Sequence, residues 1–426
     1  MRDLNVVHAA SLARVDDGGL ARRGATQGDL GVIANGAIAI RGGVIVAVGT
    51  TEEVLATHAA DEVPTIEAHG RCVLPGLVEC HSHPLFAGDR HHEYAERLAG
   101  ASLAEVAARG GGIWSSVVAT RQAGDDELLV RLTTTLRRIM SGGVTTLEVK
   151  SGYGLTVAEE LRQLELLQRA RSSTPMELAI TFLGAHVVPR DLDGDVSSVP
   201  AERAERYTDL IEGEMLPAVA RQGIAQFQDV TVEQGYFTPD QALRLMRRGS
   251  QLGLPVRVHA DAWAPSQGWR TAVEGGAVSA EHLTYTSPDE IRGVGRTDTV
   301  AVILPMAELI YMTSQRANAR LFIENEVPVA IATDYCSSIH ASSLLNTVAT
   351  AAPWFRMTPA EVIVGATLNA AYSLGLQSSC GSLDLGKRGD LLILDCEHPD
   401  EVCLAVGSPI LDTVVIAGEV VVGVGS

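Results

Sequence analysis

The sequence of 426 residues lacks any apolar run of about 18 residues, the length that a helix needs to cross a bilayer. Its first residues, MRDLNVVHAA, lack the basic segment and apolar stretch that mark an exported protein. We therefore expect a soluble protein of the cytoplasm. Basic residues are also scarce: 33 Lys and Arg against 52 Asp and Glu give a net charge of −19. That balance argues against nucleic acid or a membrane surface as a partner.

Cysteine is scarce as well, with six residues and no CxxC pair. In a chain of this length, such spacing argues against a disulfide scaffold and against the common zinc and redox motifs. The nucleophile elbow GxSxG and the P-loop are missing, and GGG at 110–112 follows no predicted strand, so it indicates a turn rather than a dinucleotide-binding loop. The chemistry must therefore be sought among the histidines and acids.

The middle of the chain alternates short apolar runs with helical patterns, which is typical of βα units around a parallel sheet. Thr238, Ser287 and Thr358 each precede a Pro and lie three residues before a Glu or Gln, as at helix starts. Eight strands close a barrel, and the chain is long enough for one with a second unit. The predicted fold is α/β, a (β/α)8 TIM barrel. Its strands are expected at 72–80, 143–149, 177–184, 225–232, 255–260, 277–283, 299–305 and 328–334.

Both chain ends are rich in β-strand patterns instead. The segment GAIAIRGGVIVAVGT (36–50) predicts a hairpin around a Gly-Gly turn, and 381–395 and 413–424 are similar in style. We therefore expect a small β-sandwich domain formed by both chain ends. The expected boundaries are 1–71 for its N-terminal part, 72–378 for the metal-dependent barrel and 379–426 for its C-terminal part.

Polar side chains stand at the carboxyl ends of several predicted barrel strands, where such barrels hold their active sites. His81 and His83 follow the first strand and project to the same side of an extended chain. His259 ends the fifth strand and Asp334 the eighth. Three imidazoles and one carboxylate suit a single Zn²⁺ or Fe²⁺ ion with water in the open position. We therefore predict His81, His83, His259 and Asp334 as metal ligands.

His282, at the sixth strand, is predicted to handle protons rather than to serve as a fifth ligand or a structural residue. A bound ion would lower the pKa of its water and polarise a substrate carbonyl or amidine. Asp334 is expected to accept the proton of that water, and His282 to steady the attacking hydroxide or to pass the proton on. His282 and Asp334 are therefore the predicted catalytic residues.

Seven further motifs are distributed along the chain: PGLVECHSH (75–83), LAGAS to GGGI (98–113), GVTTLEVKSGYGL (143–155), TFLGAH (181–186), HAD (259–261), SAEHL (279–283) and ATD (332–334). With these motifs the sequence resembles the imidazolonepropionases, members of the amidohydrolase superfamily that open the imidazolone ring in histidine breakdown. The resemblance covers roughly residues 30 to 422, and GDR followed by KSGYGL and FLGAH is its most specific part.

The resemblance implies that Arg90, Tyr153 and His186 bind the propionate carboxylate of the substrate. A guanidinium fork suits a carboxylate, and it would supply a local cation in a protein of strongly negative charge. The resemblance also implies that Lys150, after the second strand, makes no second metal site, so one ion is expected.

Two segments depart from the resembled family. After HAD that family has Glu or Gln, which contacts the substrate ring, and this chain has Ala262. After ATD the family reads roughly x-N-P-G-[ST], and this chain reads YCSSI at 335–339. Losing a polar contact to a buried ring nitrogen costs about 1–3 kcal/mol. Cys336 and Ser338, with Ser337 and Trp263, are the candidate substitutes.

Three functions remain open on the sequence. The first is ring-opening hydrolysis of 4-imidazolone-5-propanoate or a close carboxylated five-membered cyclic amide, a small anionic heterocycle. The second is deamination of a carboxylated cyclic amidine, which would release ammonia. The third is a non-catalytic ligand-binding relative that lost activity through Ala262 and Cys336, against which the complete metal set and His282 speak. A homodimer is expected from the family alone.

Overall fold

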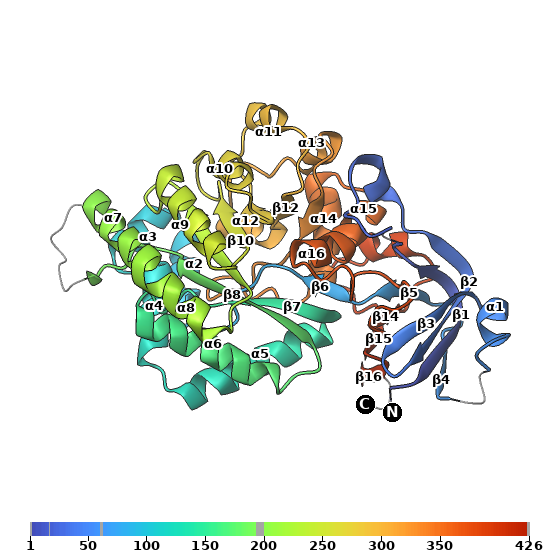
Figure 1. The fold of residues 1–426 in the computed structure, drawn as a ribbon. Helices are drawn as coiled ribbons and strands as arrows, with labels where there is room; N and C mark the ends of the chain where they lie inside the picture. Colours follow the sequence, from blue (N-terminus) through green and yellow to red (C-terminus); the bar gives the residue numbers. More distant parts are fainter. Residues whose placement is uncertain (1, 17, 60–62, 193–199, 424–426) are drawn as a thin grey trace.

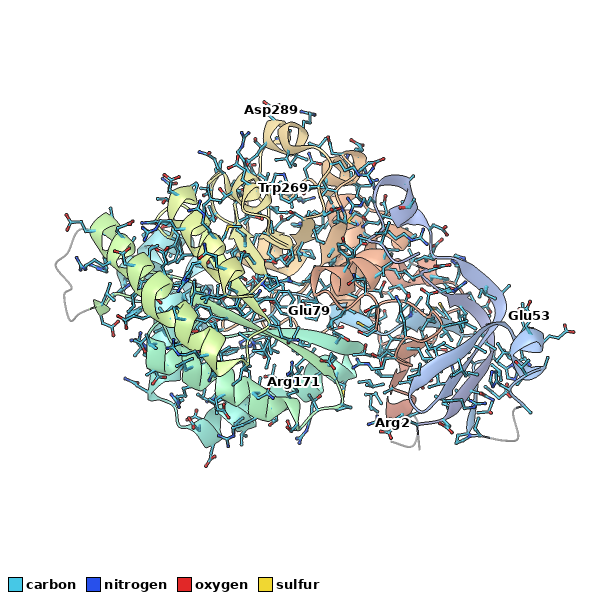
Figure 2. All side chains as sticks on the ribbon, in the orientation of Figure 1. Arg2, Glu53, Glu79, Arg171, Trp269 and Asp289 are labelled. Atoms are coloured by element: carbon cyan, nitrogen blue, oxygen red, sulfur yellow. The ribbon has the colours of Figure 1, made fainter. Side chains whose placement is uncertain are left out.

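The computed structural model describes residues 2–16, 18–59, 63–192 and 200–423. Figure 1 shows two parts: a larger barrel surrounded by helices, and a smaller sheet at which the two chain ends lie close together. Arg2 and Glu419, near those ends, form an ion pair of 3.9 Å, and Arg2 is labelled beside the small sheet in Figure 2. Within the described residues, no helix has the length and apolar character to span a membrane.

The barrel consists of eight parallel strands, as predicted. Their order follows the chain, and each strand pairs with the next. A parallel bridge between Ser82 and Tyr335 joins the segments after the first and last strands. The Thr333 N–H donates to the buried Glu79 carboxyl group at 3.0 Å, and Figure 2 labels Glu79 in the middle of the molecule. The strands are β6 (Leu77–Glu79), β7 (Val144–Lys150), β8 (Glu177–Ala185), β9 (Phe227–Val232), β10 (Val256–Ala260), β11 (Ser279–His282), β12 (Val300–Ile303) and β13 (Val329–Ile331).

The first predicted strand, 72–80, was wrong in one respect, because it is two strands in different sheets. Residues Cys72–Pro75 form β5 of the small sheet, and only β6 belongs to the barrel. The chain changes sheets at Gly76, where a Cβ atom would lie 2.3 Å from the Thr145 hydroxyl oxygen on β7. Pro75 also lacks the N–H that a continuous strand would need. Close packing against β7 therefore requires glycine at this crossover.

Most helices lie around the barrel, whereas α1 packs against the small sheet (Figure 1). Several helix starts follow the predicted pattern. Thr238 and Thr358 form reciprocal capping boxes with Gln241 and Glu361, and the Ser287 hydroxyl accepts the N–H of Glu290. The helices are α1 (Thr51–Leu55), α2 (His91–Leu98), α3 (Leu103–Ala108), α4 (Ile113–Gln122), α5 (Asp125–Ser141), α6 (Val157–Arg171), α7 (Pro200–Leu210), α8 (Leu216–Gln222), α9 (Pro239–Gln251), α10 (Gly268–Glu274), α11 (Pro288–Val294), α12 (Pro305–Tyr311), α13 (Ala319–Glu324), α14 (Leu344–Phe355), α15 (Pro359–Gly365) and α16 (Leu368–Ser373).

The expected β unit from both chain ends is one hydrogen-bonded sheet of eight strands, ordered β16-β15-β14-β5-β1-β2-β3, with β4 paired to β1. The predicted hairpin is present: Gly42 and Gly43 turn at φ +59° and +86°, a conformation that favours glycine. The domain boundaries at 71/72 and 378/379 stay predictions. The strands are β1 (Leu4–Ala13), β2 (Val32–Arg41), β3 (Val44–Thr50), β4 (Thr65–Glu67), β14 (Leu391–Leu394), β15 (Leu411–Ile416) and β16 (Glu419–Val422).

Candidate functional site

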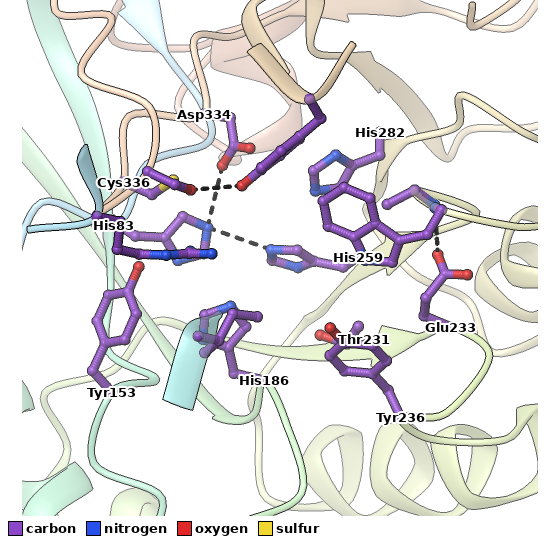
Figure 3. A pocket seen from close by; sticks show the side chains of 16 residues that line it. His83, Tyr153, His186, Thr231, Glu233, Tyr236, His259, His282, Asp334 and Cys336 are labelled. Atoms are coloured by element: carbon purple, nitrogen blue, oxygen red, sulfur yellow. Dashed lines mark hydrogen bonds and ion pairs between the residues drawn. The ribbon is translucent and has the colours of Figure 1, made fainter. Parts of the chain in front are cut away.

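A pocket with about 510 Å³ of empty space lies at the carboxyl ends of the barrel strands (Figure 3). In a βα barrel this face holds the active site because the loops after the strands converge there. Ten of the pocket's sixteen lining residues were predicted from the sequence as site residues or as substitutes in ring recognition: His83, Arg90, Tyr153, His186, His259, Trp263, His282, Asp334, Cys336 and Ser338. His81 lies just beneath them, fully buried.

The four predicted metal ligands converge in the floor of this pocket. The Nε2 atom of His83 lies 3.3 Å from that of His81 and 3.4 Å from that of His259. An Asp334 carboxylate oxygen, Oδ1, lies 3.4 Å from Nε2 of His81 and 3.6 Å from Nε2 of His83. Ligands of one small cation are spaced in this way, because each bond to the ion is about 2 Å long.

The chemistry of this donor set fits a divalent metal ion. Burial lowers the pKa of His81 and of His83 well below the ordinary value, so both rings are neutral and offer lone pairs. The Nδ1 atoms of both rings are buried without a hydrogen-bond partner among the described residues. Three imidazole nitrogens facing one another gain little from mutual hydrogen bonds, and a cation between them would satisfy all three.

Asp334 and His282 are held at the strand ends in an uncommon backbone conformation. Their φ angles are +56° and +75°, in a region that residues with a Cβ atom rarely adopt, and such strain is often found at functional sites. Burial raises the pKa of Asp334 to about 7, although His259 and Lys150 oppose the shift. A buried carboxylate with so little compensation is stabilised by a cation beside it. The His282 ring centroid lies 5.6 Å from that of His81 and 5.4 Å from that of His259.

A buried network of charges lies behind the ligands, and the sequence analysis did not identify it. The His259 Nδ1–H donates to Asp229 at 3.0 Å, so its Nε2 faces the cluster. Lys150 donates to Asp229 at 2.8 Å and to Glu148 at 2.6 Å. Burial alone would lower the pKa of Lys150, but the two carboxylates raise it. The Lys150 ammonium group is thus charged and hydrogen-bonded to both of these acids.

Arg257 completes this network, with Nε 3.0 Å from Glu148 and a terminal nitrogen 3.0 Å from Glu281. Glu281 in turn lies 3.8 Å from Nδ1 of His81. The sequence did carry a signal for this network. Charged residues such as Asp229 and Glu281 stand inside strands whose neighbours are apolar, and a charge buried in a barrel interior must have a partner.

Arg90 and Tyr153 approach the pocket from the side of β6 and β7. Arg90 Nε donates to Glu93 at 2.7 Å, while the side chain remains only 8 % exposed. Within the described residues its terminal nitrogens make no hydrogen bond, so they remain open to an anion. The Tyr153 hydroxyl lies 3.4 Å from the Ser337 hydroxyl. The structure thus brings a cation and a phenol into one pocket wall.

His186 lies in the same wall, and its ring is stacked on His83 at 5.3 Å between centroids. Its Nδ1–H donates to the Gly152 carbonyl at 2.9 Å, so Nε2 can donate to a carboxylate only when the ring is protonated. Burial opposes protonation, lowering the pKa of His186 to about 3. A bound anion would favour it.

The wall opposite Arg90 contains the segments that depart from the resembled family. Ala262 and Trp263 donate their N–H groups to the Glu233 carboxylate at 2.6 and 3.0 Å, which fixes the loop after β10. Trp263 is a wall of the pocket and meets Tyr311 edge to face, with 4.6 Å between ring centroids. The sequence analysis identified neither Glu233 nor Tyr311, because their roles depend on loops that meet only in the fold.

The replaced segment at 335–339 also reaches this wall. Ser338 accepts or donates a hydrogen bond of 2.7 Å with the Tyr311 hydroxyl, and lies 3.4 Å from the Cys336 sulfur. Both residues line the pocket, and their role as substitutes in ring recognition stays a prediction. Ser337 does not line it: its hydroxyl is buried against Ser116 at 2.7 Å. This hydrogen bond holds the 335–339 loop in place, and the Ser337 hydroxyl does not face the pocket.

Comparison with known proteins adds sequence evidence to this geometry. The amidohydrolase family matches residues 72–421, and the imidazolonepropionase-like composite domain of bacteria matches residues 36–60. The imidazolonepropionase of Geobacillus kaustophilus is 40% identical over 401 residues, covering 93% of this chain and 92% of that protein. The imidazolonepropionase of Symbiobacterium thermophilum is 39% identical over 426 residues, covering 99% of this chain and 98% of its own length.

Solved structures with the same fold are more distant in sequence. An adenosine deaminase from Xanthomonas campestris with bound zinc superposes with a TM-score of 0.69 at 19% identity, covering 99% of this chain and 93% of that one. At this identity the likeness supports the fold alone: a barrel with an accompanying β unit.

Proposed function

The chain belongs to the amidohydrolase family and, within it, to the imidazolonepropionases, and from this membership we infer that it is a hydrolase that opens the ring of 4-imidazolone-5-propanoate at a C–N bond. This reaction belongs to histidine degradation. The observation that carries the inference to individual residues is the convergence of three imidazoles and Asp334 in the floor of a pocket whose wall holds Arg90. A location in the cytoplasm and a homodimer stay predictions.

We assign the divalent metal ion of this family to His81, His83, His259 and Asp334. Three imidazole nitrogens and one carboxylate suit Zn²⁺ and Fe²⁺, and we propose one of these two ions. When bound, such an ion lowers the pKa of a water molecule toward about 7 and polarises the carbonyl group that is attacked.

The side chains around the ligands supply the proton transfers and hold the substrate. Asp334 takes a proton from the attacking water, and His282 holds the attacking oxygen in place by a hydrogen bond. The oxygen bonds to the ring carbonyl carbon, the bond from that carbon to the ring nitrogen breaks, and Asp334 returns the proton to the nitrogen. Arg90, Tyr153 and His186 bind the propionate and thereby place the ring over the floor of the pocket.

The other end of the substrate ring faces the pocket wall whose residues differ from those of the resembled family. Trp263 and Tyr311 offer aromatic surface there, and Cys336 and Ser338 offer short polar groups. We propose that these groups take over the ring contacts that Ala262 cannot make. A close carboxylated analogue of the imidazolone, such as a hydantoin or amino-imidazolone propionate, is therefore the alternative substrate to test.

A substrate panel tests this assignment directly. Ring opening of imidazolone, hydantoin and amino-imidazolone propionates is followed by ultraviolet absorbance, and ammonia is assayed in parallel. We expect the imidazolone to be opened without ammonia release, since hydrolysis of the ring amide frees none. Stoichiometric ammonia would instead identify a deaminase of a cyclic amidine, and turnover of no compound would favour the non-catalytic relative.

Asp229 provides a prediction about the charges behind the ligands. We expect Asp229→Asn to weaken metal binding about 10–100-fold, because an uncharged amide oxygen accepts the Nδ1–H of His259 more weakly than a carboxylate does, and outer partners of metal ligands typically contribute that much. The measurement is the metal dissociation constant together with the Tm of the metal-free protein.

The matched control for this variant is Asp298→Asn, the same chemical change at a side chain that is 84% exposed. It should leave the metal dissociation constant unchanged. If Asp229→Asn lowers only the Tm and leaves metal affinity intact, Asp229 is a folding residue and does not position His259.

A further inference from the structure

A second group of metal-binding side chains lies on the small sheet, away from the pocket. We propose that His8, Glu67 and His69 form a surface site for a divalent transition-metal ion. The Nδ1 atom of His8 lies 2.7 Å from Oε2 of Glu67, and Nε2 of His69 lies 3.2 Å from the same oxygen. One donor atom from each residue lies within 4.8 Å of the others. This site is independent of the ring-opening reaction.

The sheet positions the three side chains by an irregularity in β1. The pairing of β1 with β2 shifts between Val6 and Ala9, and His8, in the bulge, has a φ of +56°. That conformation is unfavourable for a residue with a Cβ atom. It places His8 beside Glu67, the last residue of β4, which pairs with Val7. A bridge between Ala9 and His69 brings the second imidazole alongside.

The two imidazole rings lie nearly parallel, 5.0 Å apart at an interplanar angle of 19°, and both face the same carboxylate. In a tetrahedral zinc site with bonds of about 2.0–2.1 Å, neighbouring ligand atoms are about 3.3 Å apart. The separation of 3.2 Å between His69 and the Glu67 oxygen is close to this value, and the 2.7 Å hydrogen bond between His8 and the same oxygen would have to widen by about 0.6 Å. Small side-chain rotations would therefore admit an ion, with the carboxylate and two imidazoles as ligands.

The chemistry and exposure of the cluster suit ions such as Zn²⁺, Co²⁺, Ni²⁺ and Cu²⁺. Imidazole nitrogen is preferred by these metals, whereas Ca²⁺ and Mg²⁺ take oxygen ligands. The side chains of His8, Glu67 and His69 are 37%, 50% and 71% exposed, so an ion can enter and water can fill its remaining positions. The net charge of −19 attracts cations to the protein.

An ion at this site would join β4 to the rest of the sheet. β4 has only three residues, and within the described sheet it pairs with β1 alone (Figure 1). His69 belongs to the segment that leads from β4 to β5 and the barrel. A ligand that binds only the folded state stabilises it, so metal at this site should raise the Tm.

Zinc binding by the intact, metal-loaded protein tests the proposal. The protein is dialysed against a series of free Zn²⁺ concentrations, and zinc per chain is measured by mass spectrometry. We expect the wild type to bind one more ion per chain than His69→Ala or His8→Ala at the same free concentration. The affinity of that ion should fall about 100-fold or more in each variant, since losing even an outer partner of a ligand costs about 10–100-fold.

Two further variants separate metal binding from folding. Glu67→Gln keeps the shape of the side chain but removes its charge, and it should also lose the additional ion. His58→Ala removes another imidazole of the same small domain and should keep it. The extra ion should raise the Tm of the wild type and of His58→Ala only, and ring opening should be equal in all of these proteins. Equal zinc content in the wild type and the His8, Glu67 and His69 variants would overturn the proposal.

Discussion

Replacing Asp334 by Ala should abolish ring opening and weaken retention of the metal ion. The carboxylate lies 3.4 and 3.6 Å from two of the proposed imidazole ligands, and it is also the proposed acceptor of the water proton. Loss of a general base alone typically costs about 10²–10⁴-fold in rate. Because a ligand is lost at the same time, we expect kcat to fall by at least about 10³-fold. The measurements are kcat and metal per chain by elemental analysis.

Asp261 offers a control at an equivalent place, directly after strand β10 of the same barrel. It has a similarly positive φ of +53°, but its carboxylate accepts hydrogen bonds from Ser266, Gly268 and Thr286, none of which is a proposed metal ligand. Asp261→Asn should therefore lower the Tm and keep the metal. An Asp334→Ala protein that still turns over substrate would remove Asp334 from the mechanism.

Arg90→Ala is expected to raise KM far more than it lowers kcat or stability. Removing one partner of a buried, hydrogen-bonded charge pair costs about 2–5 kcal/mol, and about 3 kcal/mol corresponds to roughly 100-fold in KM. Glu93 keeps its bonds from the Gly112 N–H and the Ser115 hydroxyl in this variant, so the local structure should persist. Steady-state kinetics with the imidazolone substrate measures the effect.

A substrate analogue without the propionate provides the control for Arg90. The wild type and Arg90→Ala should process this analogue with the same KM, because the lost guanidinium contact is absent in both cases. Arg90→Lys should rescue KM only in part, because an ammonium group cannot present the paired N–H groups of a guanidinium. If the wild type opens the analogue as readily as the acid, Arg90 does not bind the carboxylate.

Much of the barrel could be predicted because the patterns that form its elements are local. Each of the eight observed strands overlaps a predicted one, and the helix starts at Thr238, Ser287 and Thr358 follow from side chains within three residues of one another. The division of 72–80 could not be predicted from such patterns. It depends on the contact of Gly76 with Thr145, which belongs to a different strand.

The candidate site also contains residues that could be predicted from the sequence and residues that could not. His81, His83, His259 and Asp334 could be selected because polar residues at barrel strand ends meet at one face of the fold. Tyr311 could not be selected in this way, because it is the last residue of α12 and does not follow a barrel strand. Only the fold brings its hydroxyl group next to that of Ser338. The sequence did name Cys336, Ser338 and Trp263 as candidate substitutes for the family's usual ring contacts, and all three line the pocket, but it gave no indication of Tyr311.

By itself, the amino-acid sequence determined the number and order of the barrel strands, the residues at their carboxyl ends and the kind of ion that those residues suit. These properties follow from hydrophobic periodicity, from capping chemistry and from the donor atoms of each side chain. Only the tertiary structure decided which nitrogen of His259 faces the other proposed metal ligands, which acid is hydrogen-bonded to Arg90 and which aromatic rings form the wall opposite it. Those outcomes require atoms from distant segments to come within about 3–5 Å of one another, and closure of the barrel is the step that brings them there.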